Sequence, residues 1–220
     1  MLGLPKQTEV NREISKIKIT KNLGVSKNSK AGKLLTEQVE KVIWRNKLSP
    51  DTLPLEKGKD IDEVQVFEIA VKTTKFDPII LKYIDQIIPY AILFIVTEQE
   101  QKQAWIAYKK VTDTGDNASV YSEYYHTQWF SEEDLKLELQ GHSVDEIYEG
   151  FIRQVAKNKI SQTTGKDIET DIVQSKEREK LEKQIAALQK KVDKEKQFNK
   201  RVELSAELKK LKNRCSELYD

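Results

Sequence analysis

The stretch Tyr90-Ala91-Ile92-Leu93-Phe94-Ile95-Val96 is the longest apolar run in the chain. A continuous apolar run of this kind is typical of a central strand that is covered on both faces. Residues 64–71 predict a second strand, because their β-branched and aromatic side chains place Phe67, Ile69 and Val71 on one face. The apolar run is far shorter than the roughly 20 residues that cross a bilayer, so no membrane association is expected.

Further elements are predicted on both sides of these two strands. Strands are expected over 42–48, 104–109, 121–129 and 135–139, and Ser49-Pro50 should end the first of them. Asp77-Pro78 predicts one helix start, and the capping box of Ser143 and Glu146 predicts another. The fold class is therefore α+β, with a mostly antiparallel sheet of about five strands and two or three helices. This domain should occupy residues 1–160.

The end of the chain has a different composition, because no Gly or Pro follows Gly165. Residues 161–172 are predicted to be a linker and residues 173–220 a coiled-coil tail. The tail has two apolar seams with heptad spacing, and the seams are out of register with each other. Either a helical hairpin that turns near residues 196–200 or one long helix fits this pattern, and the hairpin is favoured. The predicted coiled-coil core consists of Leu181, Ile185, Leu188, Val192, Leu204, Leu208, Leu211, Cys215 and Leu218.

The charge is unevenly distributed along the chain. Residues 1–50 contain 11 Lys and Arg against 4 Asp and Glu, whereas residues 51–167 contain 13 against 21. Residues 1–33 are expected to form an irregular basic arm, in which Lys16, Lys18 and Lys21 would contact DNA phosphates weakly and without sequence preference. A solvated arm without a partner is the alternative.

The composition excludes several classes of site. One Cys and two His cannot form an intrachain disulfide or the usual zinc ligand sets. No phosphate-binding glycine loop and no calcium loop is present. Neither a cofactor nor a metal is therefore expected.

One enzymatic alternative involves Glu68 and Lys72. Restriction-type nucleases place an acid on one strand and an acid-x-Lys motif on the next, so that carboxylates hold Mg²⁺ and the lysine orients the attacking water. The corresponding element here would be Glu68-Ile69-Ala70, which has alanine at the lysine position. A divergent nuclease that uses Lys72 instead is the alternative, and an ion pair on a half-solvated strand is the simpler interpretation.

Several short motifs are spread along nearly the whole chain. They are Leu4-Pro5-Lys6, Glu9-Val10-Asn11, Lys47-Leu48-Ser49-Pro50-Asp51-Thr52, Glu63-Val64-Gln65-Val66-Phe67-Glu68, Ile88-Pro89, Leu93-Phe94, Thr127-Gln128-Trp129 and the charged helical end around Phe198, Arg201 and Leu204. Together they resemble an uncharacterised bacterial family, domain of unknown function 4391. Members of that family typically lie beside genes for a helicase and a DNA methyltransferase in restriction-like, phage-defence clusters.

The resemblance implies an accessory subunit of such a DNA-modification system, which is expected to be non-enzymatic. A cytoplasmic location is expected because no secretory signal and no membrane-spanning run is visible in the sequence. Its expected partner is the helicase or DNA methyltransferase subunit. Homo-oligomerisation through the coiled coil is a second expectation, and a DNA-binding module that uses the basic arm is a further alternative.

Overall fold

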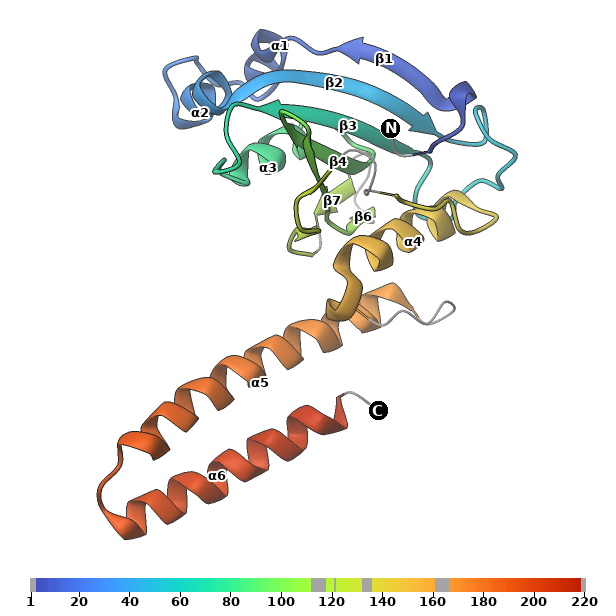
Figure 1. The fold of residues 1–220 in the computed structure, drawn as a ribbon. Coiled ribbons are helices and arrows are strands. Elements are labelled where there is room, and N and C mark those ends of the chain that lie inside the picture. Colours follow the sequence, from blue (N-terminus) through green and yellow to red (C-terminus); the bar gives the residue numbers. More distant parts are fainter. Residues whose placement is uncertain (1–2, 112–117, 121, 132–135, 161–166, 219–220) are drawn as a thin grey trace. The chain divides into compact units, whose positions relative to one another are not determined.

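A computed structural model describes residues 3–111, 118–120, 122–131, 136–160 and 167–218 (Figure 1). The chain divides into two compact units, Met1–Lys157 and Asn158–Asp220. The first unit contains the sheet, and the second contains the two C-terminal helices.

The first unit is built on a mixed sheet with the strand order β1-β2-β3-β4-β5-β8, and β9 pairs with β5. β3 and β4 are parallel, whereas every other neighbouring pair in this sheet is antiparallel. β6 and β7 form a separate antiparallel pair. The strands are β1 (Glu9–Glu13), β2 (Val39–Leu48), β3 (Val64–Val71), β4 (Ala91–Glu98), β5 (Gln101–Ile106), β6 (Lys109–Val111), β7 (Ala118–Val120), β8 (Tyr125–His126) and β9 (Phe130–Ser131).

Three short helices cover one face of this sheet: α1 (Lys16–Asn22), α2 (Lys30–Gln38) and α3 (Ile79–Asp85). α3 makes the crossover that two consecutive parallel strands require. The core on this face joins helix residues to the register partners Phe67 of β3 and Phe94 of β4. The longer α4 (Val144–Ala156) packs against β5 and β8. No helix among the described residues has the length and apolar character needed to cross a bilayer.

The α+β class and the mostly antiparallel sheet are confirmed, but the sheet has more strands, and the chain more helices, than predicted. β3 begins and ends at the predicted residues. The segment predicted to be an irregular arm instead contributes β1, α1 and part of α2. Ile19 of α1 packs in the core of the domain, where it is 1% exposed. Short elements of this kind leave little periodic signal in the sequence.

The strand predicted over 135–139 is not present in its described part, residues 136–139. Gln154 of α4 provides the reason, because its side chain satisfies both backbone groups of Glu138. Gln154 Oε1 accepts from Glu138 N at 2.8 Å, and Gln154 Nε2 donates to Glu138 O at 2.9 Å. A backbone that pairs with a side chain in this way needs no neighbouring strand. The strand predicted over 121–129 is also shorter, since β8 has only two residues.

The second unit is a helical hairpin of α5 (Ile168–Lys194) and α6 (Phe198–Glu217) (Figure 1). The helix breaks without Gly or Pro, at a short turn in which Gln197 N donates to Glu195 Oε1 at 2.8 Å. Polar contacts between the helices include Arg214 Nη2 to Glu177 Oε1 at 2.5 Å and Lys212 Nζ to Gln189 Oε1 at 3.3 Å. Among the seam residues, Leu181, Leu188, Leu208 and Cys215 are buried, and Ile185, Val192, Leu204, Leu211 and Leu218 are half-buried.

A chain that ends after Gln162 is expected to keep a cooperative thermal transition. The reason is that all the residues of the core around Phe67 and Phe94 lie before residue 158. Circular dichroism of the shortened and the full chain checks this. A broad, non-cooperative loss of signal in the shortened chain would show that the sheet depends on the hairpin for its stability.

Candidate functional site

The predicted nuclease pair Glu68 and Lys72 is engaged by other groups in the structure. Arg45 makes a bidentate ion pair with Glu68, with Nε at 2.9 Å from Oε2 and Nη2 at 3.1 Å from Oε1. Lys72 Nζ donates to Thr36 O at 3.0 Å. Glu68 and Lys72 therefore bind two separate groups of the fold, the Arg45 guanidinium and the Thr36 carbonyl. The geometry gives no support to a common site on these two residues.

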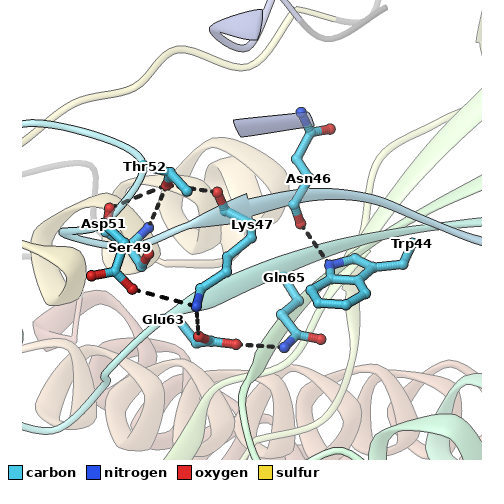
Figure 2. Close-up of polar contacts among 8 residues, drawn as sticks. All are labelled: Trp44, Asn46, Lys47, Ser49, Asp51, Thr52, Glu63 and Gln65. Atoms are coloured by element: carbon cyan, nitrogen blue, oxygen red, sulfur yellow. Dashed lines mark hydrogen bonds and ion pairs between the residues drawn. The ribbon is translucent and has the colours of Figure 1, made fainter. Parts of the chain in front are cut away.

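A different group of polar side chains meets where β2 ends and β3 begins. We call Lys47, Asp51, Glu63 and Gln65 the strand-end cluster (Figure 2). Lys47 Nζ lies 2.9 Å from Glu63 Oε2 and 3.6 Å from Asp51 Oδ2. Gln65 Nε2 donates to the other Glu63 oxygen, Oε1, at 2.5 Å. Lys47 and Gln65 are also direct register partners across the antiparallel β2–β3 pair.

Two loops hold the acidic members of the strand-end cluster in place. Thr52 Oγ1 accepts from Ser49 N at 3.1 Å and donates to Lys47 O at 2.8 Å, which fixes the turn that presents Asp51 (Figure 2). The loop before Glu63 is held by the Asp145 carboxylate of α4. This carboxylate accepts from Lys59 N at 2.5 Å, Asp60 N at 3.2 Å and Ile61 N at 2.8 Å.

The strand-end cluster extends from the protein interior to solvent. The exposed side-chain fraction is 11% for Glu63, 29% for Lys47 and 84% for Asp51. The hydrogen bond to Glu63 raises the pKa of Lys47 above its usual value, so its ammonium group is charged at neutral pH. The cluster thus combines two carboxylates, one amide and one permanent cation.

An apolar cavity of about 310 Å³ lies on the same face of the sheet, between α1 and the end of α3. Trp44 and Phe67 line it with rings stacked at 6.3 Å and 7°. Gln65 belongs to both the cavity lining and the strand-end cluster, and it is only 6% exposed. The remaining lining residues are Ile14, Lys18, Ile19, Asn22, Val42, Ile84, Ile87, Ile88, Pro89 and Tyr90. A volume of this size is at the lower end of the range for small-ligand pockets.

A buried lysine fixes one wall of this cavity. Lys109 Nζ lies 2.6 Å from Asp85 Oδ1 and donates to the carbonyls of Ile88 and Tyr90 at 2.7 Å each. The side chains of Lys109 and Asp85 are 1% and 3% exposed. Burial lowers the pKa of Lys109 and raises that of Asp85, and their mutual attraction opposes both changes. Tyr124 also donates to Asp85. The network holds the segment after α3 against Lys109 at the start of β6.

The three lysines predicted to contact DNA all lie on α1, but in different surroundings. Lys16 Nζ donates to Val39 O at 2.9 Å and so connects α1 to the start of β2. Lys18 is exposed and lines the cavity, and Lys21 is exposed. Only Lys18 and Lys21 are therefore well placed for a phosphate, and their contact with DNA stays a prediction.

An exposed apolar surface lies at the turn of the hairpin. Phe198 and Val202 are 69% and 52% exposed, and they are four residues apart on α6. Residues at this spacing lie on one face of a helix. We call this pair the tip patch. Because Phe198 and Val202 remain this exposed, they add little to the packing within the hairpin.

A family model described as Domain of unknown function (DUF4391) matches residues 2–214. No curated protein and no solved structure matches the chain. Since the matched residues cover nearly the whole sequence, the chain belongs to the Domain of unknown function (DUF4391) family.

Proposed function

We propose that the protein is an accessory subunit of a bacterial restriction-like or phage-defence DNA-modification system, and that its C-terminal hairpin binds the partner protein. The observation that carries the proposal is the exposed tip patch of Phe198 and Val202. The choice of partner, a helicase or DNA methyltransferase subunit, comes from the family resemblance of the sequence.

The hairpin has the properties of a binding element. Its two seams face each other as in a coiled coil, with Leu181, Leu188, Leu208 and Cys215 buried between charged outer faces. The tip patch is left outside this seam. Fully burying a Phe or Val side chain contributes about 1.5–3 kcal/mol, so a partner that covers both would gain appreciable affinity. Exposed aromatic residues of this kind are frequent anchors of protein interfaces.

Substitution of the tip patch tests the proposal. The full chain, tagged and expressed in its native host, is compared with the double variant Phe198→Asp/Val202→Asp. The matched control is Asn199→Asp/Asn213→Asp, which adds the same two negative charges at exposed positions of α6 and leaves both apolar side chains of the tip patch in place. We expect the wild type and the control to capture a helicase or DNA methyltransferase subunit, identified by mass spectrometry, and the tip-patch variant to lose it.

Two results would contradict the proposal. The first is capture that is equal in the tip-patch variant and the control, because the partner would then bind elsewhere. The second is a wild-type chain that forms a homodimer through the same patch and captures neither enzyme. Light scattering of the purified variants distinguishes the second result, since only the tip-patch substitutions would then convert the dimer to a monomer.

A further inference from the structure

The strand-end cluster has the composition of a restriction-type nuclease site, with one residue moved to the neighbouring strand. Asp51 lies in the turn after β2, which ends at Leu48, and Glu63-Val64-Gln65 is an acid-x-Gln element at the start of β3, which begins at Val64. Such nucleases use an acid after one strand and an acid-x-Lys element on the next. Here Gln65 takes the lysine position, and Lys47 lies directly opposite it on β2.

From this geometry we propose a phosphodiesterase site in which Asp51 and Glu63 hold a divalent cation and Lys47 lies beside the attacking water. The substrate class is a phosphodiester of a nucleic acid. Carboxylate, amide and hydroxyl oxygens are the ligands that Mg²⁺ and Mn²⁺ prefer.

One buried oxygen without a partner supports a missing cation independently of the carboxylates. Ser49 is 3% exposed, and its Oγ is buried with no partner in the described part of the chain. Ser49 lies next to Asp51 (Figure 2). Buried polar atoms are nearly always satisfied, so an open oxygen beside Asp51 indicates an absent partner at the cluster.

The adjoining cavity fits the proposed substrate. Its lining includes the rings of Trp44 and Phe67, and single-stranded nucleic acids commonly stack their bases on aromatic side chains. Lys18 provides a cation for a phosphate at the same cavity. Gln65 connects this cavity to the carboxylates, so a nucleotide held there would have its phosphate close to the strand-end cluster.

The reaction is a hydrolysis and requires no further reactant. The oxygen of water forms a bond to phosphorus, the bond from phosphorus to the leaving ester oxygen breaks, and that oxygen receives a proton, which leaves one phosphomonoester and one hydroxyl. The cation would polarise the phosphoryl oxygen and acidify the water. The ammonium of Lys47 would orient the water and offset the negative charge that develops on the phosphoryl group.

The experiment uses the full chain and two readouts. Mn²⁺ binding is measured by titration calorimetry, and cleavage is measured with single-stranded DNA, double-stranded DNA and single-stranded RNA oligonucleotides in Mg²⁺ or Mn²⁺. The variants are Asp51→Asn, Glu63→Gln and Lys47→Met. The matched controls are Glu68→Gln and Lys72→Met, which make the same changes on or next to β3, outside the cluster. Asp51 is 84% exposed, so Asp51→Asn tests the site even if Glu63→Gln unfolds the protein.

We expect Asp51→Asn and Glu63→Gln to lower Mn²⁺ affinity at least about tenfold, a loss that even outer-shell changes at metal sites produce. Lys47→Met should abolish cleavage while the protein still binds Mn²⁺, and both controls should behave like the wild type. The inference would be overturned by absence of Mn²⁺ binding at millimolar concentration, or by binding that Asp51→Asn leaves unchanged. Binding without cleavage of any of the three substrates, or cleavage that survives in Lys47→Met, would overturn the catalytic assignment.

Discussion

Replacing Lys109 with methionine is expected to lower the free energy of unfolding by about 3–5 kcal/mol, the usual cost of breaking a buried ion pair. The variant leaves the Asp85 carboxylate buried without its cation, and it removes the donor that joins the carbonyls of Ile88 and Tyr90. Urea unfolding followed by circular dichroism measures the change.

The double variant Lys109→Met/Asp85→Leu is the control for this prediction. It removes both charges together, so it should recover part of the stability lost in Lys109→Met. A Lys109→Met protein that is destabilised by less than about 1 kcal/mol would show that water reaches Asp85 and that the pair does not hold the segment after α3.

Phe94→Ala is expected to have an effect of similar size, about 3–5 kcal/mol. Phe94 is 0% exposed at the centre of β4, and its ring lies 6.3 Å from that of Tyr124. The matched control is Phe198→Ala, which removes the same side chain from an exposed position and should change stability by no more than about 0.5 kcal/mol. Equal losses in both variants would mean that the tip patch is packed in the free protein, contrary to its exposure.

The central strands could be predicted from the sequence because their side chains are buried on one or both faces. β3 and β4 are strongly apolar, and seven of the eight β4 residues are buried. The predicted cap at Ser143 was also correct, since Ser143 Oγ accepts from Glu146 N at 3.3 Å. Local signals of this kind predict an element well when its own residues determine its conformation.

The N-terminal elements could not be predicted in the same way. β1 is paired on one side only, and four of its five residues are exposed, so its sequence lacks apolar alternation. α1 has only seven residues, three of them lysine, which resembles a solvated arm. The alternation of Leu and charged residues over 135–139 is typical of a strand, and it wrongly predicted one. A side chain of α4, and not a neighbouring strand, satisfies the backbone groups of Glu138.

The strand-end cluster was missed because it depends on register. Lys47 and Gln65 are 18 positions apart, and only the antiparallel pairing of β2 with β3 places them opposite each other. Along β3 and the residue that follows it, the first lysine on the same face as an acid is Lys72 after Glu68, and this same-strand pattern predicted the other pair. The available signal was the acid-x-Gln element at the start of a predicted strand, together with the acid that follows the strand before it.

Amide hydrogen exchange of the complex shows most directly whether the hairpin binds the partner protein. The captured complex is compared with the free chain, and exchange is followed by mass spectrometry of peptides from both units. We expect slower exchange in the complex around the turn and the first part of α6, residues 195–205, where the tip patch lies. Slower exchange confined to peptides of the sheet unit, with the hairpin unchanged, would contradict it.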